Sequence, residues 1–215
     1  MLCDLMSEYM CEDEFGNSTI CNIYFDTPEY LLIRRSIEHP VYKEKLRVRS
    51  YGKVEDDTTV FVELKKKYDG VVYKRRIDMP YKSVREYLCE GKLNIPKTQI
   101  TNEIDYVLSF YGNINPSMYI SYEREAYYSK TDSNFRITFD KNILWRDYDL
   151  TLKSEVYGKP LLSDDEMVLE VKTSLAMPLW LTQFLSKNKI YKASFSKYGN
   201  AYKTKVLKGD LMNVG

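Results

Sequence analysis

Alternation of charged and apolar residues is the feature of this sequence that most constrains its fold. Side chains on a β-strand point in turn to the two faces of a sheet, so residues two apart share a face. The run Leu46-Arg47-Val48-Arg49 places both arginines on one face and both apolar residues on the other. The run Val62-Glu63-Leu64-Lys65 repeats this arrangement. Strands of this kind have one face to bury and a second face that is charged.

Further runs carry the same pattern along the chain. They are Tyr73-Lys74-Arg75-Arg76-Ile77, Tyr122-Glu123-Arg124-Glu125-Ala126, Arg136-Ile137-Thr138-Phe139-Asp140 and Val168-Leu169-Glu170-Val171-Lys172. For a single strand, a charged face is most simply a face toward water. The repetition favours instead a closed antiparallel β-barrel wrapped by helices, with apolar faces on the helices and charged faces in the bore. The predicted fold class is therefore α+β.

The remaining pattern predicts consecutive antiparallel strands joined by helices. Asp69-Gly70 supplies the positive φ of a tight hairpin turn. Asp26 or Thr27 is expected to cap the helix predicted at residues 28–38. Strands are predicted at residues 19–26, 41–51, 58–67, 71–79, 117–128, 134–140 and 166–173. Helices are predicted at residues 28–38, 82–90, 102–111, 178–187 and 197–208.

Length and charge narrow the possible functions. The 215 residues suit one domain, predicted to span residues 1–215. The 32 basic and 31 acidic residues nearly cancel, so no nucleic-acid or membrane-surface partner is expected. The start lacks a basic leader and no long apolar window occurs, which predicts a cytoplasmic protein. Four cysteines without zinc spacing and a single histidine, His39, argue against His-rich metal sites.

The charged faces of the predicted strands are strongly positive. The candidate lumen contains nine cations, Arg47, Arg49, Lys65, Lys74, Arg76, Arg124, Arg136, Lys172 and Lys197, and two anions, Glu63 and Glu170. Buried unpaired charge is costly, so an anion must enter such a bore. Arginine forks match phosphate oxygens, which predicts an oligophosphate ligand. The two acids are expected either to hold a divalent metal or to form structural ion pairs.

Eight short motifs resemble those of the vacuolar transporter chaperone (VTC) domain, and they occur in the same order from about residue 20 to about residue 203. They are Ile23-Tyr24-Phe25-Asp26-Thr27, Arg47-Val48-Arg49-Ser50-Tyr51-Gly52, Val62-Glu63-Leu64-Lys65, Tyr73-Lys74-Arg75-Arg76, Tyr122-Glu123-Arg124-Glu125-Ala126, Arg136-Ile137-Thr138-Phe139-Asp140, Leu169-Glu170-Val171-Lys172 and Phe195-Ser196-Lys197-Tyr198. The resemblance places the chain among the triphosphate tunnel metalloenzymes. It implies a transferase that moves the ATP γ-phosphate onto a growing polyphosphate chain, with Mn²⁺ or Mg²⁺ in the tunnel.

The resemblance also implies roles for particular residues. Arg47, Arg49, Lys65, Lys74, Arg124, Arg136 and Lys197 resemble the phosphate ligands of the catalytic site. Arg76, Lys172 and Ser196 are expected to bind the cofactor phosphates beside them. Glu170 resembles the metal ligand, and Glu63 is a second candidate for that role.

Two other functions share the same predicted bore. A tunnel triphosphatase would hydrolyse short oligophosphates, and a non-catalytic protein would only bind polyphosphate. The family pattern begins with a strand that carries a Lys-Tyr pair, whereas this chain begins in a helical pattern at Leu2-Cys3-Asp4-Leu5-Met6. That first strand is expected to be missing, and the barrel edge left open is a possible surface for oligomerisation.

Overall fold

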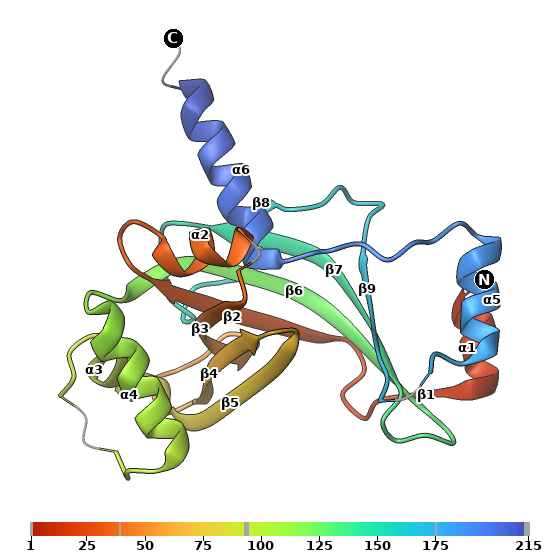
Figure 1. The fold of residues 1–215 in the computed structure, drawn as a ribbon, viewed down its shortest axis with the longest axis horizontal. Helices are drawn as coiled ribbons and strands as arrows, with labels where there is room; N and C mark the ends of the chain where they lie inside the picture. Colours follow the sequence, from red (N-terminus) through yellow and green to blue (C-terminus); the bar gives the residue numbers. More distant parts are fainter. Residues whose placement is uncertain (1, 39, 93–94, 175, 213–215) are drawn as a thin grey trace. The chain divides into compact units, whose positions relative to one another are not determined.

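The computed structural model describes residues 2–38, 40–92, 95–174 and 176–212, so His39 lies outside the described residues. The described chain is an α+β protein built on an antiparallel sheet (Figure 1). The strands are β1 (Met10–Glu12), β2 (Ser18–Asp26), β3 (Tyr42–Tyr51), β4 (Thr59–Tyr68), β5 (Val71–Pro80), β6 (Asn115–Ser129), β7 (Arg136–Arg146), β8 (Lys159–Pro160) and β9 (Val168–Lys172). The helices are α1 (Leu2–Tyr9), α2 (Leu31–Ile37), α3 (Tyr81–Leu88), α4 (Gln99–Tyr111), α5 (Leu179–Lys187) and α6 (Lys197–Met212).

The strand order confirms the predicted antiparallel α+β class. Strands follow the order β5-β4-β3-β2-β6-β7-β8, with β1 paired to β6 and β9 paired to β7. Within the part of the chain that the structure describes, this order does not return to its first strand, so the sheet is open. An open sheet agrees with the prediction of an unclosed barrel edge and not with a fully closed barrel. The short strands β1 and β8 were not predicted.

The chain divides into two compact units, and each is described by itself. Unit 1 comprises Met1–Thr19, Tyr122–Asn142 and Leu162–Phe195, and unit 2 comprises Ile20–Ser121, Ile143–Leu161 and Ser196–Gly215. The prediction that residues 1–215 form a single domain is not tested by this division into units. None of the described helices is both long enough and apolar enough to cross a membrane.

In unit 2, strands β3, β4 and β5 form a meander whose register is set by a tight turn. Asp69 (φ 43°) and Gly70 (φ 82°) both adopt positive φ between the paired residues Tyr68 and Val71, which confirms the predicted hairpin. Leu46 of β3 lies opposite Leu64 of β4. In this register the apolar residues of neighbouring strands share one face of the sheet and the charged residues share the other.

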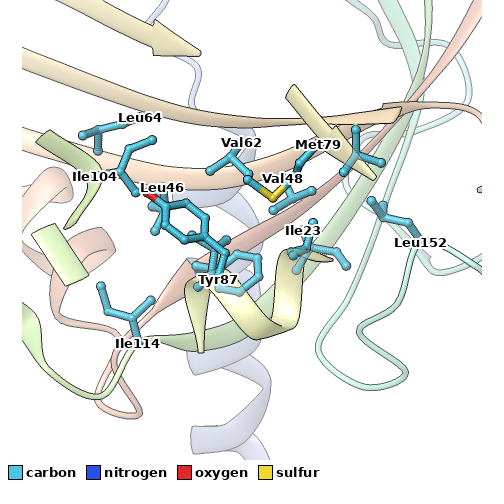
Figure 2. Close-up of a cluster of buried hydrophobic side chains, with 14 of the residues drawn as sticks. Ile23, Leu46, Val48, Val62, Leu64, Met79, Tyr87, Ile104, Ile114 and Leu152 are labelled. Carbon is cyan, nitrogen blue, oxygen red and sulfur yellow. The ribbon is translucent and has the colours of Figure 1, made fainter. Parts of the chain in front are cut away.

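The apolar face of this meander is the core of unit 2. Helices α3 and α4 cover it, and Figure 2 shows how side chains from the strands and the helices meet. The core residues from these strands and helices include Leu46, Val48, Val62, Leu64, Val84, Tyr87, Ile104 and Val107, all buried. Each fully buried aliphatic side chain stabilises the fold by about 1.5–3 kcal/mol. The prediction that the apolar faces of these strands pack against helices is confirmed.

Helix α2 begins later than predicted. Tyr30 adopts a left-handed conformation (φ 58°), so the helix begins at Leu31, three residues after Pro28. The two predicted capping residues still satisfy its first amides. Asp26 accepts hydrogen bonds from the amides of Leu32 (2.8 Å) and Ile33 (3.0 Å), and Thr27 Oγ1 accepts one from Leu31 (3.1 Å).

In unit 1, the pairing of β7 with β9 places Thr138 opposite Glu170. Helices α1 and α5 lie side by side, with the rings of Tyr9 and Trp180 stacked at 4.9 Å (Figure 1). The core of this unit consists of apolar side chains from these helices and from β7, with β9 packed against them; its members include Met6, Phe135, Ile137, Phe139, Leu181, Leu169 and Val171. The apolar side chains of β9, Leu169 and Val171, are therefore partly buried against this core, as expected.

Candidate phosphate-binding face

The face of β3, β4 and β5 opposite the core carries most of the predicted site residues, and we call it the basic face. Neighbours across these strands are paired in register, for example Arg47 with Glu63 and Glu63 with Arg76. Its members are Lys43, Lys45, Arg47 and Arg49 of β3, Phe61, Glu63, Lys65 and Lys67 of β4, and Val72, Lys74, Arg76 and Asp78 of β5. The only acids on this face are therefore Glu63 and Asp78.

Glu63 is the centre of the basic face. Its side chain is 1% exposed, and Arg47 Nε donates to its Oε2 at 2.8 Å while Arg47 Nη2 lies 2.7 Å away. On the other side, Lys74 Nζ lies 3.0 Å and Arg76 Nε 3.2 Å from Oε1. Arg49 Nε is 3.8 Å from Oε2. One carboxylate thus holds four cations in place.

The electrostatics of Glu63 follow from these contacts. Burial by itself would raise the pKa of this carboxyl, but Arg47, Arg49 and Lys74 outweigh it and lower the pKa to about 2. Arg76 also lies over the ring of Phe61, with its guanidinium carbon 3.8 Å from the ring centre. Glu63 is therefore ionised, and the surrounding cations remain in excess.

Lys45 belongs to this site although the sequence analysis did not select it. Its Nζ donates to Ser196 Oγ at 2.8 Å, and burial lowers the pKa of Lys45 to about 8 with help from Lys65 and Lys43. Lys45 is two residues from Arg47 on β3, so the two side chains share a face, and this alternation could have predicted Lys45 from the sequence.

Tyr24 of β2 was also missed. Its hydroxyl accepts a hydrogen bond from Arg47 Nη1 at 3.1 Å. Burial by itself would raise the pKa of Tyr24, but the positive charges of Arg47, Lys45 and Arg49 outweigh it and lower the pKa. The spacing of residues in the sequence does not indicate that Tyr24 is close to Arg47. The two residues become neighbours because they are paired in the register of β2 with β3.

The start of helix α6 is fixed beside Lys45. Ser196 Oγ accepts from the amide of Gly199 at 3.1 Å, which makes it a helix cap. Tyr198 donates its hydroxyl hydrogen to the buried Asp26 Oδ2 at 2.9 Å, and its ring stacks on Tyr24 at 4.5 Å. These contacts hold Ser196, and with it Lys197 at the first position of α6, close to the basic face.

Other predicted residues lie in unit 1 around the buried Asp140. Arg124 donates to both oxygens of Asp140, at 2.6 Å and 2.7 Å, and its Nη2 lies 3.6 Å from Glu170 Oε2. Lys172 Nζ lies 3.4 Å from Glu170 Oε1. Burial would lower the pKa of Arg124, but the contacts with Asp140 and Glu170 raise it instead. This cluster is a network of ion pairs.

Arg136 and Lys65 were predicted as phosphate ligands and lie in different units. Arg136 Nη2 is 3.7 Å from Asp13 Oδ2, while its Nε is buried and has no hydrogen-bond partner among the described residues. Lys65 is exposed on the basic face, where it lies opposite both Lys45 and Lys74.

The two candidate metal ligands have different surroundings. Both oxygens of Glu63 face cations, so its contacts favour the ion-pair alternative over a metal. Glu170 also has a cation near each oxygen, but these contacts are longer, 3.4 Å to Lys172 and 3.6 Å to Arg124, and its side chain is 43% exposed. Mg²⁺ and similar ions use one or two such carboxylates together with phosphate oxygens, so Glu170 suits this role better than Glu63. The described residues contain no group of three or more His, Cys, Asp or Glu side chains able to hold a metal alone.

Comparison with solved structures identifies the class of fold. A candidate adenylate cyclase from Bacillus halodurans superposes with a TM-score of 0.52 and 12% identity over 86% of this chain and 81% of the other. A candidate adenylyl cyclase from Hippeastrum, described as having a dominant triphosphatase activity, gives a TM-score of 0.50 and 17% identity over 92% of this chain and 85% of the other. The chain therefore has the fold of the triphosphate tunnel proteins.

The family follows from the sequence as a whole. The family model of the VTC domain matches residues 3–206, and the chain belongs to this family. No curated protein matches the sequence. The resemblance carried by the short motifs is thereby confirmed at the level of the family.

Proposed function

We propose that this chain is a polyphosphate polymerase, which transfers the γ-phosphate of ATP to the end of a growing polyphosphate chain. Membership of the VTC family supports the proposal. The observation that carries it is the excess of cations around Glu63, where one carboxylate lies within 4 Å of four cationic side chains. A phosphate polymer supplies the negative charge that balances such an excess.

The residues of the basic face have complementary roles in this proposal. The guanidinium groups of Arg47 and Arg76 pair with phosphate oxygens, and Lys74 adds a point charge that follows the chain. Glu63 keeps these cations in one place before the ligand arrives. Arg49, Lys65, Ser196 and Lys197 are further proposed phosphate ligands within unit 2, and Lys45 is added because it shares their face and contacts Ser196. Arg124, Arg136 and Lys172 belong to unit 1, and their role as phosphate ligands stays a prediction from the sequence.

The reaction needs positioning and charge neutralisation more than it needs a side-chain nucleophile. An oxygen of the terminal chain phosphate forms a bond to the γ-phosphorus of ATP. The bond from that phosphorus to the bridging oxygen breaks, and ADP leaves with the electron pair. The attacking oxygen is already ionised at neutral pH, so the reaction does not require a histidine base.

A divalent metal fits this proposal through Glu170. Mn²⁺ or Mg²⁺, when bound, would neutralise phosphate charge, and the partly exposed carboxylate of Glu170 in unit 1 suits either ion. Glu63 keeps the role of an ion-pair partner, because its oxygens face Arg47, Lys74 and Arg76.

The second candidate is a triphosphatase, and the Hippeastrum protein with the same fold and a described triphosphatase activity favours it. In that case water would take the place of the chain phosphate as the acceptor. Both candidates use the basic face, and they differ in the product.

Product analysis after incubation with ATP and Mn²⁺, and separately with Mg²⁺, tests the proposal. Long polymer on a sizing gel is the expected result. Free phosphate without polymer identifies a triphosphatase, and binding of polyphosphate with neither product identifies a binding protein; either result overturns the polymerase. Arg47→Gln with Arg76→Gln should abolish synthesis, whereas Lys66→Gln, on the helix-covered face, should retain it.

A further inference from the structure

A pocket lies at the outer end of the basic face, where β4 turns into β5. Its volume is about 300 Å³, and it is lined by Pro40, Val41, Lys43, Lys67, Asp69 and Gly70. The turn that forms one wall is held by the amide of Asp69, which donates to Val41 O at 3.0 Å. None of the site residues predicted from the sequence lines this pocket.

Two lysines face each other in this pocket. Lys43 and Lys67 are directly opposite in the pairing of β3 with β4, and like charges in such a position repel each other. Lys43 Nζ donates to the backbone oxygen of Ser36 at 3.2 Å, and burial together with Lys67 and Lys65 lowers the pKa of Lys43. Lys67 makes no ion pair with an acid among the described residues. The pair is therefore unfavourable without an anion.

The pocket continues the row of cations that begins at Glu63. Two residues along β4 from Glu63 is Lys65, which lies opposite Lys45 on one side and Lys74 on the other. Two residues further is Lys67. At about 3.4 Å per residue, Lys67 lies about 14 Å along the strand from Glu63. Tripolyphosphate is too short to cover this distance, whereas a longer linear phosphate chain follows the whole row.

We propose that the Lys43–Lys67 pocket is an outer subsite of the basic face, which binds a phosphate unit of a polyphosphate chain whose other end lies at the Glu63 cluster. This inference rests on the proposed function for its ligand. The subsite makes the protein prefer long chains over short ones, since only long chains contact both places.

Asp69 gives the subsite a property of its own. Among the described residues that line the pocket, Asp69 is the only acid, and its negative charge reduces the positive charge of the two lysines. Because one acid offsets part of the charge of two lysines, the subsite binds a phosphate unit weakly enough for that unit to be released as the chain grows. Removing the acid should therefore tighten the binding of long chains.

Calorimetric titration with tripolyphosphate and with long-chain polyphosphate tests the subsite. In the variant Lys43→Gln with Lys67→Gln, we expect affinity for the long chain to fall about tenfold, with tripolyphosphate affinity unchanged. Asp69→Asn should raise the long-chain affinity, a gain that damage to the fold cannot produce. Lys66→Gln, which removes one positive charge one residue away from Lys67 on the opposite face, is the control.

Three results would overturn the subsite: an equal fall for both ligands, no fall for the long chain, or weaker binding in Asp69→Asn. The titration needs no turnover, so it is independent of the polymerase assay. If the long-chain effect appears but no polymer forms from ATP, the subsite stands and the polymerase fails. If polymer forms but the lysine variant binds long chains as tightly as the parent, the polymerase stands and the subsite fails.

Discussion

Two buried carboxylates show how one sequence pattern produces two different kinds of site. Glu63 in unit 2 is surrounded by cations from β3 and β5, and the side chains of Lys74 and Arg76 are 49% and 37% exposed. Asp140 in unit 1 is bound by Arg124 through two short hydrogen bonds, and that arginine side chain is only 15% exposed. The cations around Glu63 can reach a ligand, whereas Arg124 is committed to its own acid.

The difference lies in the balance of charge. Glu63 is one acid among four cations, and Asp140 shares Arg124 with a second acid, Glu170. A cluster with excess positive charge is stable only when a counter-ion completes it, while a paired network is complete by itself. We therefore expect loss of Arg124 to change mainly the stability, and loss of the partly exposed cations around Glu63 to change mainly anion binding.

The largest expected effect separates the two clusters directly. Arg124→Ala leaves the buried Asp140 without its bidentate partner and should lower the free energy of unfolding by about 3–5 kcal/mol. Arg76→Ala leaves Glu63 with Arg47, Arg49 and Lys74. The ion pair of the partly exposed Arg76 should therefore contribute less than about 1 kcal/mol. Urea unfolding at neutral pH measures both. Similar losses in the two variants would contradict the comparison.

The next effect is the pH dependence produced by Glu63. Its pKa is about 2 in the folded protein, below the ordinary value of 4.5, so its contribution to stability is complete above pH 4.5 and is lost as the pH falls toward 2. The difference corresponds to about 3 kcal/mol. Glu63→Gln should be less stable than the parent by a similar amount at neutral pH.

Denaturant unfolding from neutral pH to acid tests this linkage. The stability difference between the parent and Glu63→Gln should shrink as the acid limit is approached. A difference that stays constant with pH would show that Glu63 is not the titrating group that holds the basic face together. Glu125→Gln, which removes a half-buried acid that pairs with Lys141 in unit 1, is a matched control and should show a much smaller change.

The smallest expected effect concerns Lys45, whose pKa is about 8. A phosphate ligand favours the charged lysine, so tripolyphosphate affinity should fall by up to about tenfold between pH 7 and pH 9, as the free lysine loses its proton. Lys45→Gln should lack this part of the pH dependence, while the ionisation of the ligand itself affects both proteins equally. Parallel affinity profiles for the two proteins would remove Lys45 from the site.

Most of the fold could be predicted because its determinants are local. Alternation separated Leu46 and Val48 from Arg47 and Arg49, and the structure places the first pair in the core and the second pair on the opposite face. Asp69-Gly70 specified the hairpin through its own backbone preferences. The start of α2 was wrong by three residues because the left-handed conformation of Tyr30 has no strong local signal in a tyrosine.

Less of the site could be predicted, because pairing between charges depends on the register of strands far apart in the sequence. Alternation shows that Arg47 and Arg124 both lie on charged faces, and it does not show that Arg124 is bound to Asp140. Tyr24 reaches Arg47 only through the β2–β3 register. The sequence therefore predicts which faces are charged, and the structure distinguishes a ligand-binding cluster from a self-paired one.

A crystal structure of the protein with tripolyphosphate tests the central claim most directly. We predict that the phosphates lie on the basic face, with oxygens on Arg47, Lys74 and Arg76 and with Glu63 still paired to these cations. Phosphates bound elsewhere in the chain, with the Glu63 cluster unchanged and free of ligand, would contradict the claim that the excess of positive charge on this face exists to bind a phosphate chain.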